Sequence, residues 1–438
     1  MSAASQALRV AARSGRPLEV VAFERTQHTS YSACGLPYWM AGDVDSGDAL
    51  VARTAEQHRK NGIDLRLGAE VMAIDLGSGH VEVRVDGVTS RVGFDELLLA
   101  TGAGPVEPSW ARGVPGVLPL KTLDDAAAWR SLLTTARRGL VVGGGYVGVE
   151  VAETLARRGL QTTLVTRGTE PLAGSLDPEM GALVRRALER AGVRVVTGTE
   201  IEGVERAPSG RLAGVCAGGE EHVADVVAVA VGVRARTSLA TDAGLALGDH
   251  GGLVPDDHQR LRPGLWAAGD CCEVFDRVVG DHRFVPLGTH ANKAGRVAGT
   301  NIGGGDALFG GVVGTAITRA GDAEVARAGV LSSWAAAHDW PVEVVSVEST
   351  TASGYMPEAD PVTVRIIASR EDGRLLGAQL VGGRGAGKRV DVAALAMWAG
   401  LSVGDVAAAD LAYAPPFSPV WDPVQIACRK AAEQVAGR

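Results

Sequence analysis

The stretch Leu140-Val-Val-Gly-Gly-Gly-Tyr-Val-Gly-Val-Glu150 decides the fold of the central part of this 438-residue chain. Gly143, Gly145 and Gly148 form the pattern G-x-G-x-x-G between an apolar run and a helix-forming sequence. In such a unit the first glycine permits a tight turn, the second lets the backbone approach a pyrophosphate, and the third permits close packing of helix on strand. The stretch therefore predicts a dinucleotide-binding βαβ unit, and we include Glu150, which closes the motif, in the expected cofactor-binding set.

The next predicted strand ends at Thr166-Arg167 and bears on which nicotinamide cofactor is used. A carboxylate at this strand end would hold the ribose diol of NAD, whereas a neutral residue followed by a cation suits the 2′-phosphate of NADP. Thr166 and Arg167 therefore favour NADPH, with NADH as the alternative. Arg167 could also be an ordinary solvated surface residue.

Outward from this unit, short and continuously apolar runs predict strands of parallel sheets buried on both faces. These runs lie at 18–23, 96–101, 139–142, 162–165, 223–231 and 265–268, with helical stretches at 147–158 and 177–191 among them. The alternation predicts a doubly wound α/β fold. From about residue 311 the pattern changes to antiparallel strands, expected at 312–317, 343–349, 361–368 and 375–380. Helices follow at 390–399 and 403–409, and then a Pro-rich segment, Tyr413-Ala-Pro-Pro-Phe-Ser-Pro419. Together these elements predict a separate α+β domain.

A second βαβ unit is indicated near the start of the chain. The run 18–23 leads into Glu24-Arg25, and Glu24 stands where a ribose-binding acid belongs. The helix before it is expected over 2–14, but the strand and Gly-rich loop that would open the unit are not in the sequence. We expect the natural chain to begin upstream of Met1.

Bulk composition restricts the class of protein. The net charge of −8 argues against nucleic acid or an anionic membrane as the main partner. No apolar run approaches the roughly 20 residues that a membrane helix needs, and no secretory signal is recognisable, so a cytoplasmic location is expected. The five cysteines form no metal-ligand pattern and no disulfide framework, so no metal is expected.

Cys34 differs from the other cysteines in its surroundings. In Ser30-Tyr-Ser-Ala-Cys34-Gly-Leu-Pro-Tyr38, Gly35 and Pro37 predict a turn that opens into a helix. A cysteine at a helix N-terminus sees the positive end of the dipole, which stabilises the thiolate that attacks disulfides. Spacing alone leaves open whether Cys34 is redox-active or structural.

The ordered motifs resemble the pyridine nucleotide–disulfide oxidoreductase superfamily, in its single-cysteine branch of coenzyme A-disulfide reductases, NADH oxidases and persulfide reductases. The matching segments span nearly the whole chain: Ser30-x-x-x-Cys34-Gly-Leu-Pro-Tyr38, Leu98-Leu-Ala-Thr-Gly-Ala103, Gly143 to Glu150, Val231-Gly-Val-Arg234, Ala267-Ala-Gly-Asp270, Pro286-Leu-Gly-Thr-His-Ala-Asn-Lys-Ala-Gly-Arg296 and Tyr413-Ala-Pro-Pro-Phe-Ser418. The resemblance implies an FAD-binding domain at 1–112 and 240–310, an interleaved NAD(P)-binding domain at 113–239, and a dimerisation domain at 311–438 that makes a homodimer.

The resemblance also implies roles for individual residues. Asp270 is similar to the ligand of the FAD ribityl chain, and Gly232 to a residue of the nicotinamide cleft. The rest of the expected flavin set is Glu24, Arg25, Thr101, Gly102, Pro286, Leu287 and Ala291. Without the family, Gly269-Asp270 reads as an ordinary turn.

Coenzyme A-disulfide reductase is the member of the branch that the chain resembles most. Contacts to the thiol substrate are implied for Gln6, Arg9, Ser30, Lys60 and His290, while Tyr355 and Tyr413 resemble two tyrosines that reach the active site from the partner subunit. Arg9 and Lys60 could equally be surface charges, and Tyr355 a packing residue. Ala33 stands where the reductase has Asn and Trp421 where it has Lys, which weakens the case for a phosphate-bearing substrate.

The resulting hypothesis is a disulfide reductase in which Cys34 alternates between a mixed disulfide and a thiolate, with electrons from NADPH or NADH passed through FAD. Tyr413, with Tyr355, is the expected proton donor to the departing thiolate. The rival enzyme classes are an NADH oxidase, in which Cys34 cycles through a sulfenic acid, and a persulfide or polysulfide reductase. The alternatives outside enzymes are a flavin-binding redox sensor without turnover and an inactive chain that binds no flavin.

Overall fold

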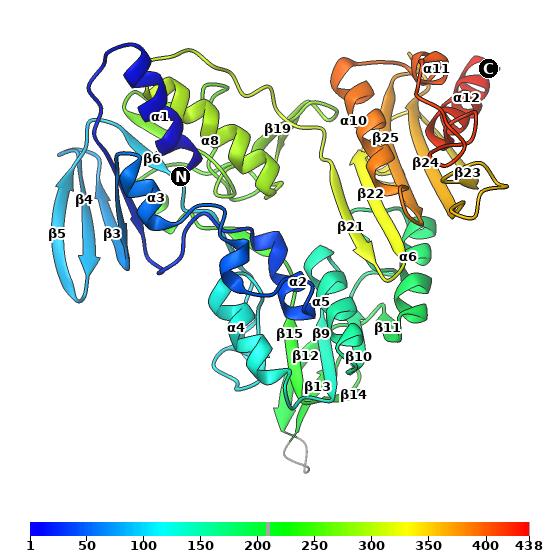
Figure 1. Ribbon diagram of the computed structural model, residues 1–438, viewed down its shortest axis with the longest axis horizontal. Helices are drawn as coiled ribbons and strands as arrows, with labels where there is room; N and C mark the ends of the chain where they lie inside the picture. Colours follow the sequence, from blue (N-terminus) through cyan, green and yellow to red (C-terminus); the bar gives the residue numbers. More distant parts are fainter. Residues whose placement is uncertain (207–210, 438) are drawn as a thin grey trace.

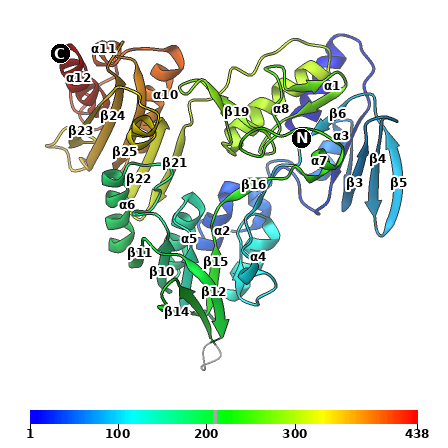
Figure 2. The ribbon, with the colours of Figure 1, turned by 180° about the vertical axis from the view of Figure 1, so that it is seen from behind.

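The central region of the chain is built on a five-stranded sheet in the order β11-β10-β9-β15-β8, with all neighbouring strands parallel. The computed structural model describes residues 1–206 and 211–437. Figures 1 and 2 show this region as the lower lobe of the molecule, with the N-terminal and C-terminal regions on either side above it. Its strands are β8 (Val117–Leu118), β9 (Arg138–Val142), β10 (Gln161–Thr166), β11 (Val193–Thr197) and β15 (Val226–Val229).

The Gly-rich stretch forms the predicted strand–turn–helix, from β9 into α5 (Tyr146–Arg157), and α6 (Pro178–Arg190) follows β10. Gly143 has φ +109°, and a Cβ there would lie 2.3 Å from the carbonyl oxygen of Ala230. A Cβ on Gly148 would lie 1.9 Å from the carbonyl oxygen of Gly143. Both positions therefore exclude any side chain, because backbone atoms already occupy the space.

One predicted strand of this region is wrong. The run 223–231 divides at Asp225, whose carboxylate accepts hydrogen bonds from the backbone N–H groups of Arg137 and Arg138 at 2.8 and 2.9 Å. Before this break β14 (Glu221–Ala224) belongs to a small antiparallel sheet with β12 (Ile201–Arg206) and β13 (Leu212–Cys216), and after it β15 enters the main sheet. Apolar continuity could not reveal that the chain changes sheets here.

The N-terminal region combines the first hundred or so residues with those after about 240. Here β1 (Val20–Glu24) pairs in parallel with β2 (Ile63–Leu67), and β18 (Leu265–Ala267) pairs in parallel with β6 (Leu97–Leu99) and antiparallel with β17 (Arg260–Arg262). The expected doubly wound sheet is thus present as two separate sheets within the described residues, since no described strand joins β1 to β18. The strand expected upstream of Met1 stays a prediction.

Other elements complete this region. Helix α1 (Ser2–Arg13) packs along α8 (Gly288–Ile302), and a Cβ on Gly299 would lie 2.2 Å from the carbonyl oxygen of Ala3. An antiparallel sheet that the sequence did not indicate extends outward (Figure 1), with strands β3 (Ala69–Asp75), β4 (His80–Val85) and β5 (Val88–Gly93). Short elements connect the regions: β7 (Ala103–Pro105), β16 (Val233–Ala235), α7 (Ser238–Asp242), β19 (Val274–Asp276) and β20 (Asp281–Arg283).

The C-terminal region is an antiparallel sheet in the order β21-β22-β25-β24-β23, flanked by helices, as the α+β prediction requires. The strand expected at 312–317 begins later, because Val312 instead forms an isolated bridge with Asp276. Strand β22 and helix α12 were not predicted. The elements are β21 (Ala316–Ala320), β22 (Ala323–Gly329), α9 (Ser332–Ala337), β23 (Val342–Thr350), β24 (Pro361–Ser369), β25 (Leu375–Gly382), α10 (Val390–Ala399), α11 (Val403–Ala408) and α12 (Pro423–Ala436).

The regions are held together by shared core and by a buried ionic network. One apolar cluster runs from Leu36 and Met40 of α2 (Leu36–Ala41) through the helices of the central region to Val325 and Val381 of the C-terminal sheet. Asp177, fully buried before α6, accepts hydrogen bonds at 2.8 Å from both Arg365 and Gln379 of that sheet. These contacts fix the position of the segment that carries Cys34 relative to the other regions.

Candidate active site

Cys34 lies in a short turn, Ala33–Gly35, that leads directly into α2. Gly35 fits closely against Leu50, since a Cβ there would come within 2.4 Å of that side chain. The thiol of Cys34 is exposed, whereas the other four cysteines, all within the described residues, are buried. Cys34 is therefore the cysteine that a substrate can reach from solution.

The charges around Cys34 come from three different segments. Although Cys34 is accessible, partial desolvation by neighbouring protein atoms raises the pKa of its thiol, and so does the negative charge of Glu150. Asp270 adds to this effect, and Lys121 acts in the opposite direction. The Nζ atom of Lys121 lies 3.9 Å from a carboxylate oxygen of Asp270. The sequence predicts that the N-terminus of a helix lowers the pKa of Cys34 and stabilises its thiolate. In the chain without ligands the pKa is raised instead. Helix α2 has only six residues, and the carboxylates of Glu150 and Asp270 outweigh its effect.

Glu150 links this cysteine to the C-terminal region. Its Oε1 atom accepts a hydrogen bond of 2.8 Å from the hydroxyl of Thr318 on β21, and burial raises the pKa of the Glu150 carboxyl. One turn further along α5, Glu153 pairs with Arg319 of the same strand at 2.9 Å. The side of α5 near Cys34 is therefore set by two contacts from β21.

Lys121 is a site residue that sequence reasoning missed. It directly precedes a helix start, where Thr122 and Asp125 form a reciprocal capping box at the beginning of α4 (Leu123–Leu132). The backbone N–H of Lys121 also donates to Asp125, at 2.9 Å. The capping pattern Thr-Leu-Asp-Asp was readable in the sequence, but it places only the helix start and not the amine beside Asp270.

The residues expected to hold the flavin meet where β6 and β18 end side by side. Gly102 and Gly269 have φ values of +69° and +93°, and the Gly102 position has no heavy atom within 4 Å of a built Cβ. Asp270 follows, with 21% of its side chain exposed, and α8 begins after Leu287 with Ala291 against Gly269. The carboxyl edge of parallel strands, open glycine backbone and a helix N-terminus together fit a dinucleotide.

Other members of the expected flavin set are placed less directly. The Thr101 hydroxyl donates to the carbonyl of Arg236 at 2.5 Å, which supports the loop after β6. The Glu24 carboxylate, at the end of β1, accepts from the backbone N–H and the hydroxyl of Thr26, both at 2.8 Å. Arg25 lies close enough to Arg236 to lower the pKa of that guanidinium, after the larger effect of burial. Pro286 directly precedes Leu287 at the entry to α8.

The nicotinamide side of the site is formed by the Gly-rich loop of the central region. A Cβ on Gly145 would meet no heavy atom within 4 Å, so this backbone faces open space, and the same is true of Gly232 after β15. Thr166 at the end of β10 is buried and its hydroxyl accepts from the N–H of Gly168 at 3.3 Å. The Arg167 side chain is 81% exposed and its Nε atom lies 3.5 Å from a carboxylate oxygen of Glu200.

Part of the expected thiol-binding set is brought together. The Ser30 hydroxyl lies 2.8 Å from Nε2 of His58, a buried histidine of α3 (Ala55–Lys60) that sequence reasoning missed. Burial lowers the pKa of His58, and Arg53 and the N-terminal amine reinforce this. On α1, Gln6 accepts from Arg9 at 2.9 Å and donates to Thr300 of α8 at 3.0 Å.

The remaining predicted substrate residues, Lys60 on α3 and His290 on α8, contact other groups. The Lys60 amine is exposed and pairs with Glu56 at 2.9 Å. His290 is buried on α8 with its Nδ1 atom 3.2 Å from the Val285 carbonyl, and burial lowers its pKa.

Tyr355 and Tyr413 are exposed on two segments that lie together, since the N–H of Ser353 donates to the carbonyl of Pro415 at 2.9 Å. The segment with Tyr413 connects α11 to α12, which lie at one upper end of the molecule, away from α2 near its centre (Figures 1 and 2). Within one chain these tyrosines are therefore remote from Cys34.

Two features are absent from the described residues. No helix among them is both long enough and apolar enough to cross a bilayer. No group of three or more metal-ligating side chains occurs among them.

Comparison with known proteins identifies the same architecture. The pattern of the pyridine nucleotide-disulphide oxidoreductase family matches residues 2–295, and that of its dimerisation domain matches residues 316–423. A solved structure, the NAD-dependent persulfide reductase from A. fulgidus, superposes with a TM-score of 0.94 at 33% identity, covering 100% of this chain and 82% of that one.

Three curated relatives carry three different names. The NAD(P)H coenzyme A polysulfide/persulfide reductase of Pyrococcus horikoshii is 34% identical over 98% of this chain and 95% of its own length. The NADH oxidase of Methanocaldococcus jannaschii is 30% identical over 97% and 95%, and the coenzyme A disulfide reductase of Staphylococcus epidermidis is 27% identical over 94% of each. The chain is an NAD(P)H-dependent flavin oxidoreductase of this group, and it belongs to the pyridine nucleotide-disulphide oxidoreductase family.

Proposed function

We propose that this enzyme reduces a small-molecule disulfide, with coenzyme A disulfide as the substrate, through the single cysteine Cys34. The observation that carries the proposal is that Cys34 is exposed while Cys216, Cys271, Cys272 and Cys428 are buried. A thiol without a cysteine partner in reach must form its disulfide with the substrate itself. The charges of Glu150, Lys121 and Asp270 act on the pKa of that thiol.

The residues that would hold FAD are Asp270, Thr101, Gly102 and the start of α8, with the Gly143–Gly148 loop for NAD(P)H. When bound, FAD supplies the two-electron transfer that links the nicotinamide to sulfur. The Cys34 thiolate attacks one sulfur of the disulfide RSSR, forms the mixed disulfide Cys34–S–S–R, and releases RS⁻. Two electrons from NAD(P)H then break that bond and return the Cys34 thiolate and a second RS⁻.

The protein's own groups handle charge and protons in this cycle. Lys121 offsets the two carboxylates near Cys34 and stabilises the thiolate as it forms, since a cation beside a thiol lowers its pKa. In a homodimer, Tyr413 of the partner subunit, with Tyr355, donates a proton to the departing thiolate. Exposed apolar residues around these tyrosines, together with the dimerisation domain, support that arrangement.

The proposed binding surface for the thiol substrate comprises Ser30 with His58, and Gln6 with Arg9. The Ser30–His58 contact joins the loop at Ser30 to α3, and a contact of 3.5 Å from Arg53 to the Ser5 hydroxyl joins the segment before α3 to α1. Neutral Thr166 followed by the exposed cation Arg167 supports NADPH as the preferred reductant.

The replacement Cys34→Ser tests the proposal directly. We expect NADPH oxidation driven by coenzyme A disulfide to fall by about three orders of magnitude or more, because a serine hydroxyl cannot form the mixed disulfide. Anaerobic reduction of the flavin by NADPH should stay near the wild-type rate. Cys216→Ser, at a buried cysteine in β13, is the matched control and should retain turnover. Disulfide turnover by the Cys34→Ser protein would refute the mechanism.

A second candidate is an NADH oxidase, which the relative of that name at 30% identity favours. Here Cys34 would cycle through a sulfenic acid. The two functions separate by oxygen uptake in the absence of any disulfide, which is rapid for an oxidase and slow for the reductase. Mass measurement of the species that a reductant releases from Cys34 distinguishes coenzyme A from another thiol or from an oxidised cysteine.

A further inference from the structure

A cavity of about 280 Å³ lies where the three regions of the chain meet, and none of its lining residues belongs to the expected nucleotide or thiol sites. Gly174 contributes from the loop after β10, Arg283 from the end of β20, and Arg327 from β22. Leu331, Ser333 and Trp334 complete the lining at α9. The volume is near the lower end of the roughly 300–1,000 Å³ typical of small-molecule sites.

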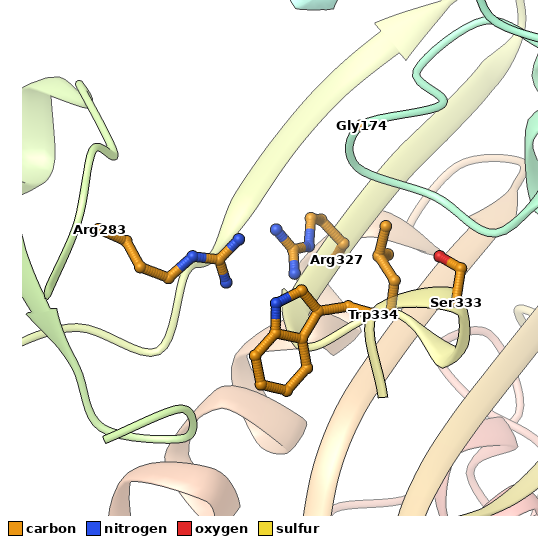
Figure 3. A pocket seen from close by; sticks show the side chains of 6 residues that line it. Gly174, Arg283, Arg327, Ser333 and Trp334 are labelled. Atoms are coloured by element: carbon orange, nitrogen blue, oxygen red, sulfur yellow. The ribbon is translucent and has the colours of Figure 1, made fainter. Parts of the chain in front are cut away.

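Two guanidinium groups face each other across this cavity. Figure 3 shows the side chains of Arg283 and Arg327 directed toward one another, with the Trp334 ring beside them. The Nε atom of Arg327 is buried and has no hydrogen-bond partner, while one of its terminal nitrogens donates to the carbonyl of Gly329. No carboxylate pairs with Arg327 among the described residues. A buried donor without a partner costs free energy, typically about 1–3 kcal/mol.

The carboxylates nearby are already used. Asp276 is buried and lies 3.4 Å from Arg283, and it also accepts from the N–H groups of Val278 and Val279 at 3.0 and 3.3 Å. Asp177 is engaged by Arg365 and Gln379, and the N–H of Ser332 adds a bond of 3.1 Å. Burial lowers the pKa of Arg327, and the positive charge of Arg283 contributes, whereas Tyr146, Asp276 and Asp177 act in the opposite direction.

We propose that this cavity binds a small phosphate-class oxyanion, free or as the phosphoryl group of a small metabolite, between Arg283 and Arg327. Planar guanidinium groups bind tetrahedral oxyanions through paired N–H donors, and the buried Nε atom of Arg327 is available for such a bond. The exposed Ser333 hydroxyl, which makes no hydrogen bond in the described chain, is a further donor at the rim. The cavity is larger than one phosphate needs, and the Trp334 ring offers an apolar surface for the remainder of a metabolite.

Such a ligand would connect all three regions, because its two arginines belong to the N-terminal and C-terminal regions and Gly174 to the central one. Binding to the folded chain alone stabilises it by mass action. The thermal unfolding midpoint should therefore rise with phosphate concentration at constant ionic strength.

The test is a titration of the full-length, FAD-loaded protein with inorganic phosphate, by calorimetry and by ³¹P line broadening, in chloride buffer of fixed ionic strength. We expect saturable binding that is at least about tenfold weaker in Arg283→Gln and Arg327→Gln, and weaker for acetate than for phosphate. Arg374→Gln, at an exposed arginine of the same region paired with Asp372, is the matched control and should bind normally. Pyrophosphate and a sugar phosphate, run in parallel, separate free phosphate from a phosphorylated metabolite.

Phosphate could also bind at the nucleotide loops, so Arg167→Ala is included. Loss of binding in Arg167→Ala with none in Arg283→Gln would overturn the proposal, as would the absence of saturable phosphate binding in the wild type. The Arg283 side chain is 34% exposed, so we expect Arg283→Gln to fold normally. This variant therefore tests the proposal even if Arg327→Gln disturbs folding.

Discussion

At the scale of single residues, the reactivity of Cys34 depends on charges contributed by distant parts of the chain. The neighbouring sequence supplies a turn and a helix start, but Glu150, Lys121 and Asp270 set the electrostatic field at the thiol. Because two carboxylates and only one amine act on the thiol, Cys34 favours its protonated form in the chain without ligands. A bound substrate or cofactor that screens Glu150 or Asp270 would shift this balance toward the thiolate.

The replacement Glu150→Gln tests this field. Removing the negative charge lowers the pKa of Cys34, so more thiolate is present at any pH below it, while the amide can still accept from Thr318. We expect alkylation of Cys34 by iodoacetamide at pH 8 to be roughly two- to tenfold faster, and the rate–pH curve to move toward lower pH.

Glu153→Gln is the control, because it removes the same charge from the same helix, where the carboxylate pairs with Arg319. Its alkylation curve should match the wild type. An unshifted curve in Glu150→Gln, measured by mass spectrometry of the labelled peptide, would show that Glu150 does not set the reactivity of Cys34.

At the scale of elements, the ends of parallel strands form the sites. β9 and β10 end at the Gly-rich loop and at Thr166-Arg167, while β6 and β18 end two or three residues before Gly102 and Gly269. Glycines at these ends expose backbone that a phosphate chain can approach, which side chains would prevent. We therefore expect strand ends to hold both nucleotides, and the residue after the end of β10 to select between NADPH and NADH.

Arg167→Ala tests the choice of nicotinamide cofactor. Loss of a cation for the 2′-phosphate should lower kcat/KM for NADPH about tenfold, equivalent to about 1.4 kcal/mol, and leave the value for NADH within about twofold. Steady-state kinetics with both cofactors measure the ratio. Arg190→Ala, at an exposed arginine ending α6, should change neither value. Equal losses for both cofactors would contradict a role in selecting NADPH.

At the scale of the whole molecule, the C-terminal region exposes a cluster of large apolar side chains. Between α11 and α12, four large side chains are exposed within nine residues: Tyr413, Phe417, Val420 and Trp421, with exposed fractions of 47%, 76%, 67% and 50%. Clusters of this kind mark interaction surfaces in soluble proteins. The match to a dimerisation domain over residues 316–423 agrees with an interface here.

Phe417→Asp tests the homodimer that we propose. A charge at the centre of an apolar interface should weaken association about a hundredfold or more, because the carboxylate would be desolvated without a partner. Light scattering after size exclusion, over a range of protein concentrations, measures the dimer fraction. Val88→Asp, at a 70% exposed valine of β5, is the matched control. A Phe417→Asp protein that stays dimeric at low concentration would exclude this surface as the interface.

The sequence by itself determined what depends on local pattern. The Gly143–Gly148 turn, the strands on either side of it, the helix over 390–399 and the turn at Cys34 follow from glycine placement and apolar periodicity, which act within a few residues. The family resemblance predicted the flavin and nicotinamide cofactors, because several motifs in a fixed order along a chain restrict its function more than any single motif does.

Only the tertiary structure decided which distant residues meet. Lys121 beside Asp270, Thr318 on Glu150, His58 on Ser30, and Arg283 facing Arg327 are contacts between segments that no periodicity relates. The split of 223–231 at Asp225 and the separation of β1 from β18 likewise reflect pairing between remote strands. Packing between distant segments sets these contacts, so the sequence around one residue does not identify the residue that it contacts.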